Sequence, residues 1–92
     1  MQYGIRYFKE LAEEGYPTAQ SILGMKYYFG DGVEKDTAKG ISWLKKAAEQ
    51  GHMEAQRQLG ELYANIDEKE SQKYFRMASA AGDNWSKSKL TK

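Results

Sequence analysis

The sequence YGIRYFKELAEEG at residues 3–15 returns in altered form as KGISWLKKAAEQG at residues 39–51. Both copies have glycine and isoleucine near the start, an aromatic residue two positions later and glycine at the end. The copies lie 36 residues apart, from Gly15 to Gly51, and a period of this size is typical of helical-repeat proteins. We therefore expect a solenoid, in which each repeat packs against its neighbours.

The repeat continues into the segment that follows each copy. The matched pairs are Ala19 and Ala55, Gln20 and Gln56, Leu23 and Leu59, Gly24 and Gly60, and Tyr27 and Tyr63. Alanine, leucine and tyrosine lie four residues apart, which places them on one face of a helix. We call the helix with this stripe the A helix of a repeat, and the helix of the first pattern the B helix. The expected order is B, A, B, A, B and a short last A.

Glycine, proline and aspartate mark the expected helix ends. Each B pattern ends in a glycine that suits a C-cap with positive φ, namely Gly15, Gly51 and Gly82. Pro17 suits the first position of an A helix. The expected N-caps are Asp36, Asp67 and Asp83.

Two glycines and five aromatic residues are expected to pack between helices. Gly24 and Gly60 stand inside the expected A helices, where glycine costs about 1 kcal/mol relative to alanine. Close approach of a neighbouring helix would explain them. The aromatic residues at repeated positions, which we predict to be interior, are Tyr7, Trp43 and Tyr74, and Tyr27 and Tyr63.

Length and composition limit the class of protein. The 92 residues suit one small domain, and a net charge of +1 gives no reason to expect nucleic-acid or membrane binding. The absence of cysteine excludes disulfides, thiolate metal sites and thiol nucleophiles. No stretch is apolar enough for a signal peptide or a membrane span. We expect a soluble cytoplasmic protein, or a secreted or periplasmic one if a leader was removed before Met1.

Residues 19–51 follow the pattern Ala-Gln-x-x-Leu-Gly-x-x-Tyr-x-x-Gly-x-Gly-Val-x-x-Asp, later Trp-x-x-x-Ala-Ala-x-x-Gly. This pattern resembles the Sel-1-like repeat, a subclass of the tetratricopeptide-like helical repeats. By this resemblance the chain is a single domain over residues 1–92. Its expected parts are the second half of a repeat at 1–18, a full repeat at 19–51, a repeat with a shortened loop at 52–82, and a degenerate capping segment with a basic tail at 83–92.

The resemblance implies an all-α fold, a right-handed superhelix of antiparallel helix pairs with about two and a half repeats. It also implies a bacterial protein-interaction scaffold that binds a protein or peptide, with neither enzymatic activity nor a cofactor. Some bacterial members neutralise a partner toxin, so the alternative function is an immunity or inhibitor protein for one enzyme. The chain departs from the family pattern at Gly40 and Ser71, where alanine is usual.

Residues that resemble other sites lack the partners that those sites need. The turn Gly30-Asp31-Gly32 has neither the ligand alternation of a calcium loop nor the Gly-Lys-Ser/Thr of a phosphate loop. His52 is the only histidine and is expected where the second A helix starts, without the companions of a triad or a zinc site. Ser21 and Ser42 lack a histidine base at matching positions.

The lysines near the C-terminus, Lys87, Lys89 and Lys92, are interpreted as a solvated end rather than a phosphate site.

The candidate binding residues flank the stripe of the A helices, which line the concave groove of tetratricopeptide arrays. They are Thr18, Ser21, Met25 and Tyr28 in the first A helix, Glu54, Arg57 and Glu61 in the second, and Trp85 in the last, with Asn65 and Ser88 as further candidates. We expect Tyr28, Met25 and Arg57 to supply most of the affinity. The alternative is an ordinary solvated face.

The two ends of the stack differ in polarity. Ile5 and Ile41 share a repeat position that is Gln72 in the third copy, as a polar C-terminal boundary would require. The first B helix keeps its isoleucine together with Tyr3, Tyr7 and Phe8, and no helix precedes it to cover them. Either the chain is part of a longer array, or this apolar end is buried in a homodimer or against a partner.

Overall fold

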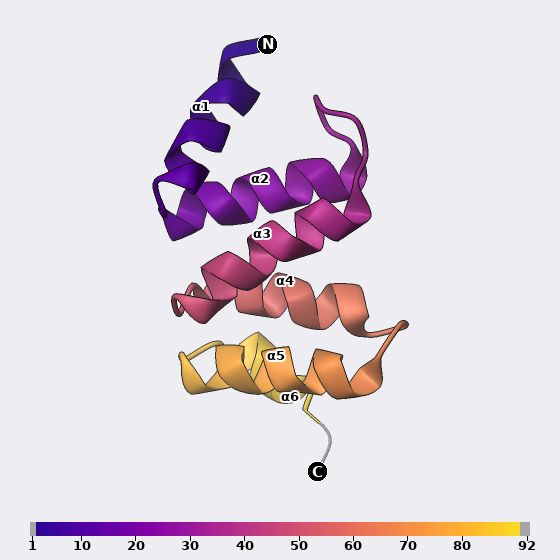
Figure 1. The fold of residues 1–92 in the computed structure, drawn as a ribbon. Helices are drawn as coiled ribbons and strands as arrows, with labels where there is room; N and C mark the ends of the chain where they lie inside the picture. The colour runs from indigo at the N-terminus through magenta and orange to yellow at the C-terminus, as the bar shows by residue number, and fades with distance from the viewer. Residues whose placement is uncertain (1, 91–92) are drawn as a thin grey trace.

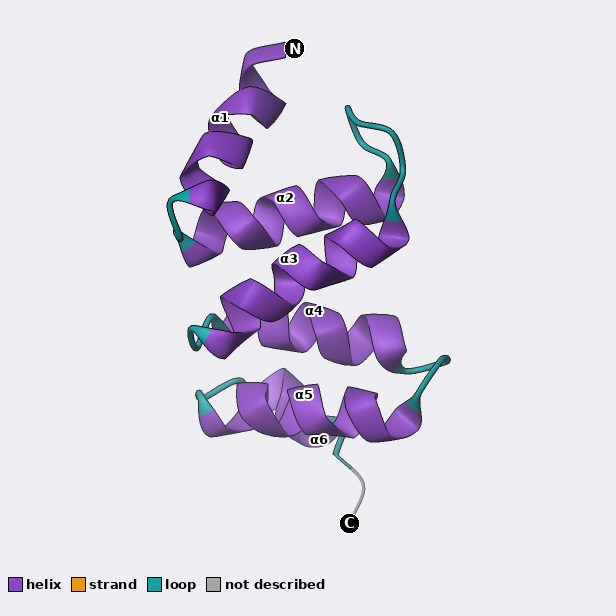
Figure 2. Ribbon diagram, viewed as in Figure 1, coloured by secondary structure: helices purple, strands orange, loops and turns teal. Residues whose placement is uncertain are grey.

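The computed structural model describes residues 2–90, with side chains described from residue 5 onward. This range forms six α-helices and contains no strand (Figures 1 and 2). The helices are α1 (Gln2–Glu13), α2 (Pro17–Phe29), α3 (Thr37–Glu49), α4 (Met53–Tyr63), α5 (Glu68–Ala80) and α6 (Asn84–Ser88). Helices α1, α3 and α5 are the predicted B helices, and α2, α4 and α6 are the A helices.

The helices form an elongated stack that runs from α1 to α5, with α6 packed on α5 (Figure 1). The stack measures 45 × 23 × 16 Å. Packing runs almost entirely between successive helices and is most extensive between α2 and α3 and between α4 and α5, the two A–B pairs. The predicted all-α solenoid of about two and a half repeats is thereby confirmed.

The helices begin and end at the residues that the sequence marks. The glycines after the three B helices have positive φ: Gly15 (101°), Gly51 (88°) and Gly82 (108°). Pro17 is the first residue of α2. Each predicted N-cap carboxylate accepts backbone N–H bonds: Asp36 from Lys39, Asp67 from Lys69 and Glu70, and Asp83 from Ser86.

Two glycines bring the backbones of α2 and α3 into contact. A Cβ atom on Gly40 would lie 2.5 Å from the carbonyl oxygen of Gly24 and 2.7 Å from the backbone nitrogen of Tyr28. A Cβ on Gly24 would meet the carbonyl oxygen of Gly40 at 2.8 Å. The glycine at position 40 is therefore a steric requirement of this helix crossing.

The second A–B pair makes the same crossing with different chemistry. Gly60 lies against the ring of Phe75, where an added Cβ would come within 2.6 Å of ring carbons. Ser71, the counterpart of Gly40, donates a hydrogen bond from its hydroxyl to the carbonyl oxygen of Gly60 at 2.7 Å. Both departures from the family pattern thus lie at the A–B crossings.

The residues of the repeated stripe form the core, apart from one end of the stack. Ala19, Leu23, Ala55 and Leu59 are buried as predicted. Tyr63 stacks on Tyr74, with ring centroids 6.0 Å apart and planes at 8°. Tyr74 is only 5% exposed, but its counterpart Tyr7 on α1 is 60% exposed, so the prediction of an interior ring is wrong there. The reason is that, among the residues described, no A helix packs on that face of α1.

The repeated glutamines join successive helices. Gln20 donates to the carbonyl oxygen of Ala12, and Gln56 donates to that of Ala48, both at 3.1 Å. Gln50, at the end of α3, then donates to the side-chain oxygen of Gln20 and to the carbonyl oxygen of Gly15, both at 2.9 Å. Within residues 2–90 the side-chain oxygen of the buried Gln56 has no such donor.

Replacing Gly40 with alanine is expected to lower the free energy of unfolding by about 2 kcal/mol, because the new methyl group forces α2 and α3 apart. The gain in helix propensity, about 1 kcal/mol, only partly offsets this strain. Urea unfolding followed by circular dichroism measures the change. Ser42→Ala, at an exposed position of the same helix, should stay close to the wild type; equal stability of the two variants would contradict the close crossing.

Replacing Ala81 with glutamine is expected to stabilise the chain by about 1 kcal/mol, because it supplies the missing donor to Gln56. Ala81 occupies the position of Gln50 in the third copy, and the backbone angles agree: φ −81° and ψ −4° against φ −85° and ψ 3°. A higher thermal midpoint is expected for Ala81→Gln but not for the neighbouring exposed substitution Ala80→Gln. A lower thermal midpoint for Ala81→Gln would contradict this prediction, because it would show that a glutamine at position 81 does not bond to Gln56 as Gln50 bonds to Gln20.

Candidate partner-binding face

Side-chain contacts link the three A helices into one continuous face. Ser21 of α2 donates a hydrogen bond from its hydroxyl to the side-chain oxygen of Gln58 on α4, at 3.0 Å. Arg57 of α4 lies 3.9 Å from the carboxylate of Asp83, the N-cap of α6. Successive A helices therefore contact one another along the stack, and the concave groove stays a prediction.

An apolar hollow of about 560 Å³ lies between α2 and α4. Its walls include Ser21, Ile22, Met25 and Phe29 of α2 and Glu54 and Gln58 of α4. Phe29 is 62% exposed at the end of α2. An ion pair between Lys26 and Asp31, 3.6 Å apart, lies at the edge. The hollow thus offers an apolar surface inside a polar rim, which suits an apolar side chain of a partner.

A smaller hollow, of about 320 Å³, lies between α4 and α6 and is lined by Arg57, Glu61 and Trp85. Arg57 is held by Asp83, which is itself buried and also accepts the hydroxyl hydrogen of Ser86 at 2.5 Å. Trp85 is 42% exposed and packs edge-to-face on Phe75, with centroids 5.8 Å apart. The guanidinium and the indole are therefore each restrained by a contact within the chain.

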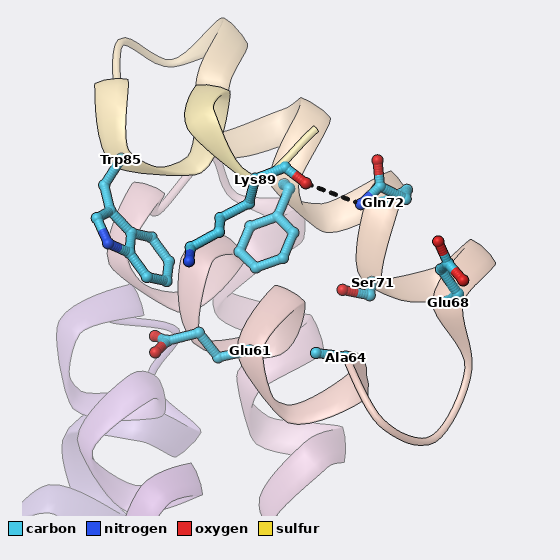
Figure 3. Close-up of a pocket in the computed structure, with 8 residues that line it drawn as sticks. Glu61, Ala64, Glu68, Ser71, Gln72, Trp85 and Lys89 are labelled. Atoms are coloured by element: carbon cyan, nitrogen blue, oxygen red, sulfur yellow. Dashed lines mark hydrogen bonds between the residues drawn. The ribbon is translucent and has the colours of Figure 1, made fainter. Parts of the chain in front are cut away.

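A third hollow, of about 580 Å³, lies on the other side of Trp85, between α4, α5 and α6 (Figure 3). Its lining includes Glu61, Glu68, Gln72, Phe75, Trp85 and Lys89. Gln72 donates to the carbonyl oxygen of Lys89 at 3.1 Å. The ammonium of Lys89 lies over the Trp85 ring, 4.9 Å from its centroid. Lys89 therefore contacts an aromatic ring, whereas the sequence interpretation placed it in a purely solvated end; Lys92 lies outside the described residues.

The structure brings together six of the eight predicted site residues. Ser21, Met25 and Glu54 line the apolar hollow, and Arg57, Glu61 and Trp85 line the smaller one. Ser21 is buried and its hydroxyl is engaged with Gln58, so it joins two A helices rather than offering a free donor.

Thr18 and Tyr28 line none of these three hollows. Thr18 is exposed in the first turn of α2. Tyr28 lies with its backbone against Gly40, and its ring packs edge-to-face on Phe29, with centroids 5.1 Å apart.

The lining residues that sequence reasoning missed include Ile22, Phe29, Gln58 and Lys89. Phe29 follows Met25 by four residues, a spacing that puts both on one helix face. That spacing was the available signal. The sequence analysis chose Tyr28 instead, which directly precedes Phe29 and lies on a different face of α2.

The apolar side of α1 is a further exposed surface. Tyr7 is exposed, and Ile5 and Phe8 are partly buried against the core of α1 and α2. The side chain of Tyr3 lies outside the described side chains. The homodimer through this helix stays a prediction.

Other chemistry suggested by single residues finds no cluster to support it. His52 is the N-cap residue of α4, the predicted position. Gly30, with φ 73°, ends α2 and begins the loop at 30–36. Within residues 2–90, no three His, Asp or Glu side chains are grouped closely enough to hold a metal ion. No helix in this range has the length and apolarity to cross a membrane.

A lysine and a tyrosine next to the core have shifted pKa values. A hydrogen bond with Tyr63 raises the pKa of Lys45, and burial raises the pKa of Tyr74. The ammonium of Lys45 lies 5.7 Å from the centroid of the Tyr63 ring that stacks on Tyr74. Both shifts favour the protonated side chain in the folded protein.

The thermal midpoint is therefore expected to fall as the pH rises past about 10, where lysine and tyrosine titrate in the unfolded chain. Each pKa is higher in the folded state, so the stability that these groups contribute is complete at lower pH and is lost at higher pH. Tyr74→Phe should make this fall shallower, and Tyr16→Phe, which removes an exposed hydroxyl, should leave it unchanged. Calorimetric scans across this pH range measure the slopes; parallel slopes for all three proteins would contradict the role of Tyr74.

Comparison with known proteins identifies the repeat. The Sel1 repeat family matches residues 17–52 and 54–83, more than half of the chain. Two similar solved structures are c5321, a protective antigen with an SLR fold from uropathogenic Escherichia coli, and a Sel1 repeat protein from Oxalobacter formigenes. A search of curated proteins gave no match.

Both solved structures share the fold over most of this chain. For the Escherichia coli antigen the identity is 32% and the TM-score 0.82, over 89% of this chain and 19% of that one. For the Oxalobacter formigenes protein the values are 31% and 0.83, over 92% of this chain and 37% of that one. The chain thus spans well under half the length of either protein. Neither is described as an inhibitor or immunity protein, so that alternative gains no support.

Sel1 repeat proteins generally mediate protein–protein interactions. The family match over two consecutive segments and the two structural neighbours agree with the helical-repeat fold described above. The chain belongs to the Sel1 repeat family.

Proposed function

We propose that this chain is a protein-interaction module that binds a segment of a protein partner along the face made by α2, α4 and α6. The observation that carries the proposal is the apolar hollow between α2 and α4, beside which Phe29 is 62% exposed. The leucines of the stripe, Leu23 and Leu59, are fully buried in the same two helices. A large exposed ring next to an apolar hollow is the usual anchor of a protein interface.

The rest of the face supplies the polar contacts that fix a partner's orientation. Arg57 and Trp85 belong to residue types enriched at interface hot spots, and their contacts with Asp83 and Phe75 hold them in position. Side chains that are already ordered lose less conformational entropy when a partner binds. The face therefore combines an apolar anchor site at α2 with a prearranged charged and aromatic site at α6.

The proposal assigns binding and not catalysis to this chain. The Sel1 repeat family is typically a non-enzymatic scaffold. The A-helix face is consistent with this assignment, because the hydroxyl of Ser21 is hydrogen-bonded to the side chain of Gln58. Protein and peptide segments are the class of ligand that this face suits.

Phe29→Ala is expected to weaken peptide binding at least tenfold. Peptides selected from a displayed random library against the wild-type chain serve as probes, and fluorescence anisotropy gives their dissociation constants. Loss of a buried aromatic anchor typically costs about 2 kcal/mol or more, which exceeds a tenfold change in affinity.

Tyr7→Ala is the matched control, because Tyr7 is 60% exposed on α1, away from this face. It should leave the dissociation constants unchanged, and circular dichroism should show that both variants stay folded. A selection whose peptides depend on Tyr7 and not on Phe29, or one that returns no binding peptide, would overturn the proposed face.

A further inference from the structure

The third hollow exists because the last A helix is short. Helix α6 has five residues, whereas α2 has 13 and α4 has 11. It packs on α5 and leaves a hollow of about 580 Å³ between the end of α4, the start of α5 and Trp85 (Figure 3). At the preceding junction, Leu62 and Tyr63 at the end of the longer helix α4 pack against the core.

The residues that line the hollow differ in polarity from their counterparts at the preceding junction. At the preceding junction, Met25 and Ile41 pack against the same core cluster as Leu62 and Tyr63 of α4. Their counterparts in the next copy are Glu61 and Gln72, which line the hollow. A carboxylate and an amide replace two apolar side chains. The hollow therefore favours a polar occupant over the apolar face of another helix.

The acidic side chains that face the hollow are unpaired, and Lys89 is the basic residue among its lining. Glu61 comes from α4 and Glu68 from α5, on two of its walls. Within residues 2–90, neither carboxylate forms an ion pair or a side-chain hydrogen bond. By contrast Arg57, one turn before Glu61, is already paired with Asp83. An incoming cation would thus find carboxylates that are available to bind it.

The aromatic ring beside these carboxylates already carries a cation of this chain. The ammonium of Lys89 lies 4.9 Å from the centroid of the Trp85 ring, and its side chain points toward that ring (Figure 3). The hydrogen bond from Gln72 to the carbonyl oxygen of Lys89 fixes the backbone there. Lys89 itself is exposed, so its side chain is free to swing out. The contact between the Lys89 ammonium and Trp85 shows that this ring accepts a cation.

We propose that this hollow binds an arginine side chain of the protein partner, with its guanidinium stacked on Trp85 and paired with Glu61, in place of the ammonium of Lys89. Arginine fits better than lysine because its planar guanidinium both stacks on an indole and donates two parallel hydrogen bonds to a carboxylate. The inference rests on the proposed function, since the arginine belongs to the segment that lies along α2, α4 and α6.

The test uses the blocked peptide acetyl-Gly-Arg-Gly-amide as probe and the same peptide with citrulline as the uncharged control. Titrations are followed by NMR at the indole N–H signals of Trp85 and Trp43. Trp43 is an internal control, because Lys46 lies 4.8 Å from its ring centroid outside this hollow. We expect a saturable shift at Trp85 with the arginine peptide only. Equal shifts at both indoles, or equal effects of both peptides, would overturn the proposal.

Two pairs of variants sharpen the assignment. Lys89→Ala is expected to strengthen probe binding about threefold, since displacing a cation from an exposed aromatic ring opposes binding by that order. Lys87→Ala makes the same charge change on exposed α6 surface and should have no effect. Glu61→Gln should weaken binding about fivefold, and Glu13→Gln, at an exposed position of α1 outside this hollow, should not. Equal effects of the two lysine variants would show that only the net charge of the chain matters, and would overturn the proposed site.

The result is separable from that of the library selection. Peptides that depend on Phe29 while the arginine probe leaves Trp85 unshifted would remove the arginine site and keep the binding face. A specific shift at Trp85 without any Phe29-dependent peptide would keep the arginine site and remove the proposed binding face. The dispersion of the amide spectrum reports in each case whether the variant is folded.

Discussion

The contact on which the fold depends is the crossing of an A helix and a B helix at backbone distance. At Gly24 and Gly40 no space remains for a methyl group on either side, so α2 and α3 form the most extensive helix pair of the stack. The close crossing lets short side chains such as Ala47 and Ala48 be fully buried at the junctions. Each B helix covers one side of its A helix, and the opposite side of the A helix is left uncovered by that B helix. The face that we propose for partner binding lies on the A helices.

Polar side chains then connect the pairs. Gln20 and Gln56 each reach back to the end of the preceding B helix, which turns two helix pairs into one stack. The pair of Ser21 and Gln58 and the pair of Arg57 and Asp83 do the same on the A-helix side. Such bonds are individually modest, about 1 kcal/mol each, but they fix orientation where apolar packing alone would allow sliding. The hollows between the A helices keep their shape for this reason.

Much of the fold was predictable from the sequence, because it is encoded locally. Gly15 and Gly51 end their helices through backbone conformation, and Asp36 and Asp67 start theirs through hydrogen bonds to residues two or three positions away. The buried stripe follows from the helical period alone. These signals involve neighbours in the chain, so a single sequence contains them.

The candidate site was predictable only in part, because it depends on contacts between distant residues. Arg57 and Glu61 lie four residues apart on α4, yet one is paired with Asp83 and the other is not. The position of Lys89 over Trp85 depends on how far α6 extends, and the choice between Tyr28 and Phe29 depends on the orientation of α2 about its own axis, around which successive residues point about 100° apart. None of these is visible in the repeat pattern, which describes what the copies share.

The hydroxyl of Ser71 has a consequence for the modularity of the chain. At the crossing of α2 and α3 the constraint is space, because a Cβ atom on Gly40 would collide with backbone atoms. At the crossing of α4 and α5 the constraint is a hydrogen bond, because the hydroxyl of Ser71 donates to the carbonyl oxygen of Gly60. Exchanging the B helices of the two pairs would therefore place a side chain where none fits and remove a donor where one is used. The repeats look like copies in sequence, but they are not interchangeable parts, and a longer or shuffled array would have to keep each A helix with its own B helix.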